Sequence, residues 1–109
     1  MSKKEITVDG VVYVQKCEQT KVRSGAWTIG TKYLIRTVTM TITGRLSFVD
    51  EHELVMEDGA WIPDTGRFSE AVKTGKVSEV EPFYGDVIIG RGSIVDACEW
   101  LHELPEVMK

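Results

Sequence analysis

The chain has 109 residues, of which 42% are hydrophobic and 8% aromatic, and its formal net charge is −4. This length suits one domain, 1–109, rather than two. The excess of acids argues against a protein dedicated to long nucleic acid, because such binding depends mainly on neutralising phosphates. Residues 1–46 hold eight Lys or Arg against three Asp or Glu, and the remainder holds five against fourteen. This split predicts contacts between the two halves, within one fold or between subunits, and leaves room for a small anion-binding pocket.

The basic start Met1-Ser2-Lys3-Lys4 is not followed by the apolar stretch of a signal peptide, and no apolar run approaches membrane-spanning length. Cys17 and Cys98 lie far apart in the sequence, without CxxC spacing or a companion histidine cluster. We therefore expect a reduced, cytoplasmic protein without a membrane partner.

The first expected element is a hairpin within 5–16. Its β-branched residues flank Asp9-Gly10, a dipeptide that supplies the positive φ of a type I′ turn. The polar, glycine-containing stretch 15–32 is expected to be a loop that carries Trp27.

The main sheet and the helix are expected within 33–104. The stretch Tyr33 to Phe48 alternates apolar and polar residues for long enough to predict a single strand, with Gly44 marking a bulge or bend. After a turn at 50–52, residues 53–57 return as its partner. One face of the long strand is expected to carry Leu34, Arg36, Val38, Met40 and Ile42.

A short helix is predicted from about Thr65 to Thr74, with Asp64 or Thr65 as its N-cap and Gly75 as its left-handed stop. Its narrow apolar stripe would dock on the sheet, and consists of Phe68, Ala71 and Val72.

Two segments remain. Val87-Ile88-Ile89 indicates a short strand, whereas Ile94 to Leu101 fits a helix or a strand, of which we favour the strand. The expected fold class is α+β: a small single domain in which one short helix packs on an antiparallel β-sheet.

The sequence gives no sign of catalysis. His52 and His102 have no partner at metal-ligand spacing, and no GxSxG, P-loop or GxGxxG motif occurs. The acids at 50, 51 and 53 are typical of a solvated turn. We therefore expect no catalytic residues, no metal, no cofactor and no enzymatic activity.

Anion binding is better supported, first by the segment at the helix start. A helix N-terminus presents free N–H groups, Gly66 permits close approach, and Arg67 adds a guanidinium that suits phosphate. Trp61 and Phe68 would offer ring faces to a base. The alternative is a surface pair of Arg67 with Asp64 or Glu70, worth about 0–1 kcal/mol.

Arg36 adds to this candidate site. It shares a predicted strand face with core-like residues, so its charge needs a buried acid from the second half or a ligand. Both interpretations stand. Arg91, between two glycines, is a further candidate ligand contact, although loop arginines are often only solvated; the same holds for Arg23 with Trp27.

The order of these elements resembles the small phage anti-defence "sponge" proteins, which counter Thoeris immunity by sequestering its nucleotide signal. The resemblance covers about residues 33–90 and rests on order and spacing. The family has a Trp-x-Trp pair and a Gly-Ala before the helix, and this chain has Trp61-Ile62-Pro63-Asp64-Thr65-Gly66 in their place. The family's Lys-Phe after the helix is replaced here by Glu81-Pro82-Phe83-Tyr84, which contains no lysine. The segments that carry the resemblance are Ile35-Arg36-Thr37, Glu53-Leu54-Val55-Met56, Trp61, Arg67-Phe68-Ser69-Glu70-Ala71 with Gly75, and Val87-Ile88-Ile89.

The resemblance implies a β-rich homo-oligomer that holds a cyclic ADP-ribose derivative or a cyclic oligonucleotide without cleaving it. Arg36 would correspond to the family's strand arginine, Trp61 to its connector aromatic, and 67–69 to its helix start. Two copies would form the pocket, in which Arg36 and Arg67 neutralise phosphate while Trp61, Phe68 or Phe83 stacks on adenine. A phage-encoded protein of this kind would act in the host cytoplasm.

Another class stays open. A phage structural or virion accessory protein would assemble as a homo-oligomer through its strand edges and need no small ligand. A third interpretation is an inhibitor that binds a partner protein through its acidic C-terminal half.

Overall fold

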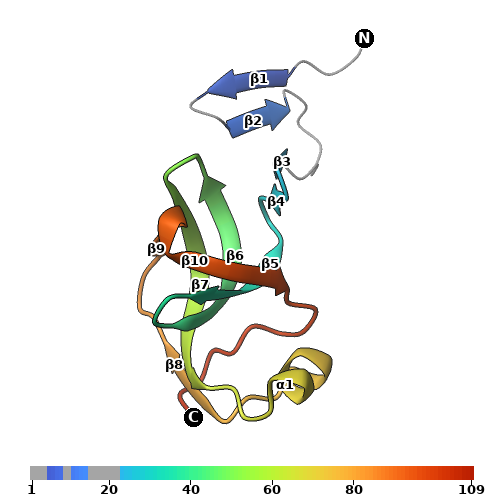
Figure 1. Cartoon of the computed structure of the whole chain (residues 1–109), viewed down its shortest axis with the longest axis vertical. Helices are drawn as coiled ribbons and strands as arrows, with labels where there is room; N and C mark the ends of the chain where they lie inside the picture. The colour runs from blue at the N-terminus through green and yellow to red at the C-terminus, as the bar shows by residue number, and fades with distance from the viewer. Residues whose placement is uncertain (1–4, 9–10, 15–22) are drawn as a thin grey trace.

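The computed structural model describes residues 5–8, 11–14 and 23–109, with side chains from residue 25 onward. Strands dominate this described part, and one α-helix lies at the end of the molecule opposite the N-terminal strands (Figure 1). The elements are β1 Glu5–Val8, β2 Val11–Val14, β3 Arg23–Ser24, β4 Trp27–Thr28, β5 Lys32–Thr37, β6 Thr41–Val49, β7 Glu53–Asp64, α1 Phe68–Thr74, β8 Glu79–Pro82, β9 Val87–Gly90, the 3-10 turn Arg91–Ser93 and β10 Ile94–Glu99.

Six strands form one antiparallel sheet in the order β10-β5-β6-β7-β8, and β9 pairs with the first part of β7 beside β8. The long strand β7 thus has β6 on one side and β9 followed by β8 on the other. The sheet is curled, so that β10 crosses in front of β6 and β7 in Figure 1. The register of β6 on β7 shifts between Thr43 and Arg45, which confirms the irregularity predicted at Gly44.

The two faces of the sheet bury separate cores. One core lies under β9 and the β4 region, and the other lies under α1 and the segment after β10. The first contains Tyr33, Ile35, Ile42, Leu46, Val49, Leu54, Met56 and Ile89; the second contains Leu34, Ala60, Ile62, Ala71, Val77, Val80, Trp100 and Leu104. The predicted combination of an antiparallel sheet with one packed short helix is confirmed, with most residues in strands.

The N-terminal hairpin is confirmed by its strands: β1 pairs antiparallel with β2, and Val8 lies opposite Val11. Asp9 and Gly10, the remaining predicted loop at 15–22, and Cys17 lie outside the described residues. In the rest of the predicted loop, β3 and β4 form a small pair that the sequence did not predict.

The predicted single strand from Tyr33 to Phe48 is wrong, because a turn at 38–40 divides it into β5 and β6. Thr37 makes this turn: its N–H donates to Met40 O at 2.7 Å, and its Oγ1 accepts the N–H of Met40 at 2.9 Å. A threonine hydroxyl can satisfy turn backbone locally. Alternation continues through such a turn, and Val38 is therefore 74% exposed at its tip rather than on a core face.

The helix begins three residues later than predicted, at Phe68, and neither Asp64 nor Thr65 caps it. Asp64 Oδ1 instead accepts the N–H of Gly66 at 2.8 Å, which forms a turn before the helix. Arg67 occupies the N-cap position and makes no side-chain cap. The predicted stop is confirmed, since Gly75 is left-handed with φ 81°.

The remaining predicted strands are confirmed, although β7 runs seven residues beyond the predicted 53–57, to Asp64. Val87–Ile89 lies in β9, and Ile94–Glu99 is the strand β10. The turn at Gly90-Arg91-Gly92 joins two strands that pair with β7 and β5 rather than with each other. Strand β8 was not predicted.

The segment after β10 fastens the helix to the sheet. The N–H of Trp100 donates to Lys32 O at 2.8 Å, and His102 Nε2 is hydrogen-bonded to Val72 O at 2.7 Å. The His102 ring lies directly against Gly75. Further along, Val80 and Lys109 exchange two backbone hydrogen bonds of 2.9 Å, so this segment also lines the outer edge of β8.

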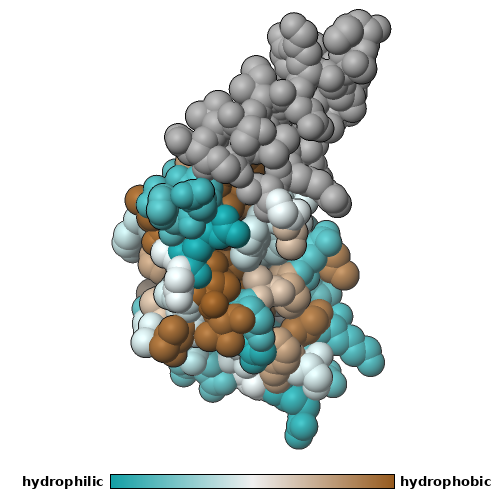
Figure 2. Space-filling model, turned by 45° about the horizontal axis from the view of Figure 1, so that its top comes forward, coloured by the Kyte–Doolittle hydropathy of each residue, from teal (hydrophilic) through white to brown (hydrophobic). Residues whose placement is uncertain are grey.

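On the face of the body seen in Figure 2, apolar side chains come to the surface between hydrophilic ones. Large apolar side chains that are exposed include Val38, Tyr84, Ile88 and Val95. Within the described ranges, the helix is far too short and polar to cross a membrane.

Gly75→Ala should destabilise the fold by about 1–3 kcal/mol. A Cβ at this position would lie 2.6 Å from His102 Cγ, and φ 81° disfavours any side chain. Urea unfolding followed by circular dichroism measures the change. Gly85→Ala is the matched control, because a Cβ there meets nothing within 4 Å. Equal stability of the two variants would contradict this account of the helix end.

Candidate functional site

Arg36 stands near the end of β5, opposite Asp96 of the edge strand β10. Its Nε donates to Asp96 Oδ1 at 2.8 Å and its Nη2 donates to Asp96 Oδ2 at 2.5 Å, a two-pronged pair in which each side chain is about half exposed. Hydrogen bonding to Arg36 holds the pKa of Asp96 below its usual range, and the same bond raises the pKa of Arg36. Arg36 therefore has the predicted acid partner from the second half of the chain, but the pair lies at the surface and is not buried.

Phe68 lies beside this guanidinium. The Cζ of Arg36 is 4.6 Å from the centre of the Phe68 ring, which is a cation–π contact. Arg36 and Trp61 also line one hollow of about 230 Å³, together with residues of the β5–β6 turn and Ile62 and Pro63. We call Arg36, Trp61, Arg67 and Phe68 the Arg36 cluster; three separate elements and the N-cap of α1 contribute to it.

Arg67 precedes Phe68 and is exposed, and it has no ion pair with any described residue, Asp64 and Glu70 included. Gly66 next to it has φ 71°, and a Cβ there would lie 2.8 Å from Ser78 Oγ. The glycine is thus needed by the turn itself, and the space beside it is filled by Ser78.

Two predicted site residues lie elsewhere. Phe83 lines a separate hollow of about 230 Å³ with Asp58, Gly59, Pro82, Pro105 and Glu106. Arg91 Nη1 donates to Asp50 O at 2.5 Å and so fastens the β6–β7 turn. In that turn the Asp50 carboxylate accepts the N–H groups of His52 and Glu53, which holds its pKa below the usual range. The Asp50 carboxylate therefore has a structural role in this turn.

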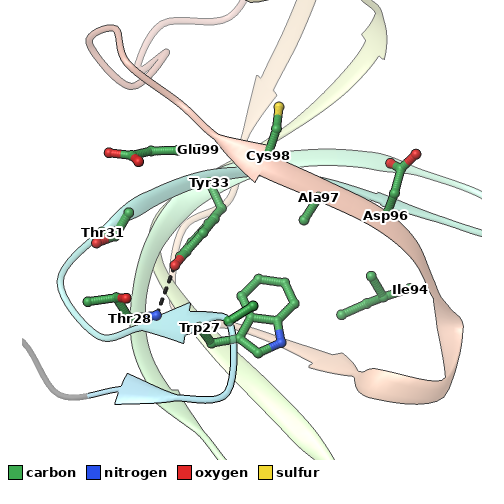
Figure 3. Close-up of a pocket in the computed structure, with 10 residues that line it drawn as sticks. Trp27, Thr28, Thr31, Tyr33, Ile94, Asp96, Ala97, Cys98 and Glu99 are labelled. Carbon is green, nitrogen blue, oxygen red and sulfur yellow. Dashed lines mark hydrogen bonds between the residues drawn. The ribbon is translucent and has the colours of Figure 1, made fainter.

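A larger cavity of about 530 Å³, which we call the Trp27 cavity, opens beside the edge strand β10 (Figure 3). Trp27 and Tyr33 meet edge to face in it, with ring centres 5.0 Å apart, and the N–H of Thr28 donates to Tyr33 Oη at 2.8 Å. In Figure 3 Ile94 and Ala97 point toward the indole, whereas Cys98 and Asp96 point to the other side of β10. The lining residues are Ala26, Trp27, Thr28, Thr31, Tyr33, Ile94, Asp96, Ala97, Cys98 and Glu99.

The Trp27 cavity is acidic and aromatic. None of its lining residues is Lys, Arg or His, and Glu99 is exposed on β10 without an ion pair to any described residue. The indole N–H of Trp27 likewise has no acceptor in the described part of the chain. A volume of this size lies within the usual range for small-ligand sites, about 300–1,000 Å³.

The chemistry of the remaining polar groups is modest. Partial burial raises the pKa of the Cys98 thiol, and the charge of Asp96 adds to this, so the thiol stays protonated and weakly nucleophilic. In the described ranges, His, Cys, Asp and Glu side chains do not gather in threes as a metal site would require.

The residues of the Arg36 cluster were predicted from the sequence as candidate ligand contacts, whereas the Trp27 cavity was not predicted. Trp27 precedes the sheet by only a few residues, and an aromatic close before Tyr33 was the available signal. Its significance depends on β10, which returns about seventy residues later to form the other wall.

Comparisons with protein-family models, with curated proteins and with solved structures found no significant match. The functional assignment therefore depends on the site itself.

Asp96 should titrate below the ordinary aspartate pKa of about 3.9, because Arg36 stabilises its charged form. The pair then contributes stability above this ordinary value, and loses it as the pH falls through the lower folded-state pKa. Carboxyl ¹³C NMR measures the titration. Arg36→Gln should return the pKa toward its ordinary value, and Arg45→Gln, which removes the pair with Asp58, should leave it unchanged. An identical Asp96 titration in all three proteins would contradict the pair.

Proposed function

We propose that the protein binds a phosphorylated nucleotide signal at the Arg36 cluster and holds it without cleaving it, as a sequestering protein. The observation that carries the proposal is the position of Arg36, which packs on the Phe68 ring and lines a hollow that Trp61 also lines, with the exposed Arg67 next to Phe68 in the chain. A ligand of the cyclic ADP-ribose or cyclic oligonucleotide type offers the phosphate and the ring that such a surface fits.

Arg36 supplies an oriented donor. Asp96 engages Nε and Nη2 from one edge, and Phe68 supports the guanidinium from one face. The N–H groups on the other edge remain for a phosphate, and their direction is already set, so less side-chain entropy is lost on binding.

Arg67 supplies the uncompensated charge. Asp96 neutralises Arg36, whereas Arg67 is exposed and has no acid partner among the described residues. Phosphate attraction at this surface therefore depends more on Arg67 than on Arg36, although Arg36 has the better-defined geometry.

Trp61 supplies the ring, and a second copy of the chain completes the site. The hollow that Trp61 shares with Arg36 holds about 230 Å³, less than the roughly 300–1,000 Å³ of ligand pockets in general. Nanomolar retention needs about −12 kcal/mol. Two charge-assisted hydrogen bonds at about 1.5–3 kcal/mol each and one stacked base at about 1–3 kcal/mol fall short of this. Contributions from two copies would supply the difference.

Arg67→Glu should abolish ligand-induced thermal stabilisation without harming the fold, because it reverses the charge of an exposed side chain that has no partner in the described part. Differential scanning fluorimetry with cyclic ADP-ribose isomers and cyclic di- and trinucleotides measures this. At a hundredfold excess over Kd, the wild type should gain about 2.7 kcal/mol, which is on the order of 10 °C for a domain of this size.

Lys73→Glu is the matched control, since it makes the same charge change on the exposed last turn of α1. It should keep the thermal shift. A full shift in Arg67→Glu would contradict the site, and no shift with any of these nucleotides in the wild type would contradict the proposed ligand class.

The structural homo-oligomer is the second candidate, and one observation favours it: Val95 of the edge strand β10 is 66% exposed, and Val38 of the neighbouring β5–β6 turn, whose N–H donates to Ser93 O just before β10, is 74% exposed. Exposed apolar side chains at a strand edge are typical of surfaces that assemble.

Light scattering after size exclusion should give twice the mass of one chain if the sequestering proposal is correct. Heating protein purified from signal-producing cells should then release a nucleotide that mass spectrometry detects. A stable oligomer whose heated extract holds no nucleotide would favour the structural candidate, and a monomer would contradict the two-copy site.

A further inference from the structure

The outer edge of β10 presents backbone groups that the sheet does not use. The N–H of Trp100 donates to Lys32 O. In an antiparallel pair only every second residue bonds to the neighbouring strand, so on β10 Cys98 and Asp96 are the residues that bond to β5. The N–H and C=O groups of Ala97 and Glu99 therefore point away from β5. Among the described strands, β10 has no neighbour on that side.

The opposite edge of the same sheet shows how this chain covers a strand. There Val80 of β8 exchanges two backbone hydrogen bonds with Lys109, so backbone from later in the chain already pairs with this edge at that residue. Strand β10 has no such cover in the described structure, and it contains neither Lys nor Pro, the residues that commonly discourage edge pairing.

The Trp27 cavity lies along this open edge. Ala97 and Glu99 have their free backbone groups at the edge and also line the cavity, and the Trp27 ring lies between Tyr33 and Ile94 (Figure 3). An added strand would send alternate side chains to this face of the sheet. The edge and the cavity thus form one continuous surface.

The charge of this surface selects a cation. Glu99 is the unpaired carboxylate, Trp27 offers an indole face, and no cation lines the cavity. In Figure 3 the Glu99 side chain points away from the indole, so successive Lys or Arg side chains of a bound strand would contact the carboxylate and the ring separately. A phosphate would be repelled, so this surface is distinct from the site of the proposed function. A second copy of β10 would bring two more carboxylates and no cation, which disfavours self-pairing.

We propose that the open edge of β10 and the Trp27 cavity bind an extended, basic segment of another protein, which adds to the sheet as a strand and places a Lys or Arg side chain in the cavity. Backbone hydrogen bonds to Ala97 and Glu99 supply the pairing, and Glu99 with Trp27 supplies the preference for a basic side chain.

The probe is a fluorescein-labelled octapeptide of alternating valine and lysine, added to the full chain and followed by fluorescence anisotropy. Two N-methylated forms test the pairing, one methylated on the odd and one on the even residues, because only one set of N–H groups faces β10. One form should lose at least tenfold in affinity and the other should bind within about threefold of the parent. A valine–glutamate peptide should not bind.

Glu99→Lys should weaken binding of the lysine peptide at least tenfold, and Glu103→Lys, an exposed acid outside the cavity, should leave it within twofold. Three results would overturn the proposal: no binding of the parent peptide at millimolar concentration, equal binding of both methylated forms, or self-association that Glu99→Lys abolishes. The last would assign the edge to a second copy.

Discussion

The pairing of β7 with strands on both of its sides is the constraint on which the rest of the structure depends. From Leu54 to Trp61 β7 pairs with β6, with two shifts of register, while β9 and then β8 occupy its other side. Glycines permit this curled arrangement: a Cβ at Gly44 would lie 3.0 Å from Met56 Cβ, and one at Gly59 would lie 3.1 Å from Val87. Because the sheet curls, a short chain can bury two cores, one on each face, with a single helix. The edge of the sheet at β10 therefore has different neighbours on its two faces, from one core on each side.

Strand β10 divides the two candidate surfaces. Its Asp96 faces Arg36 and Phe68 on the side of α1, whereas its Ala97 faces Trp27 and Tyr33 on the other side. Alternation along one strand thus separates a surface with an uncompensated cation from one with an uncompensated acid. Two ion pairs, Arg36 with Asp96 and Arg45 with Asp58, connect the basic first half of the chain to the acidic second half. Both pairs are about half exposed, so they orient side chains more than they stabilise the fold.

The parts that were predictable from the sequence are those whose signals are local. The left-handed Gly75, the β-branched run at 87–89 and the paired strands of the N-terminal hairpin all have such signals. The turn at 38–40 does not, because the hydroxyl of Thr37 makes it without a glycine or proline. Strand β8 exists because β7 offers it an edge, which no local pattern reveals. Likewise Arg36 was recognisable as a cation that needs a partner, but its partner lies 60 residues away and depends on the register of β10.

The late position of β10 in the chain has a consequence for synthesis. Its partner β5 leaves the ribosome about 60 residues earlier, which at 5–20 residues per second is a delay of roughly 3–12 s. During that interval the margin of β5 is bare and Leu34 and Trp100 have not met, so half of the interior is incomplete. Pairings between such distant segments also slow folding. The nascent chain is thus exposed to chaperones and to aggregation until β10 and Trp100 emerge.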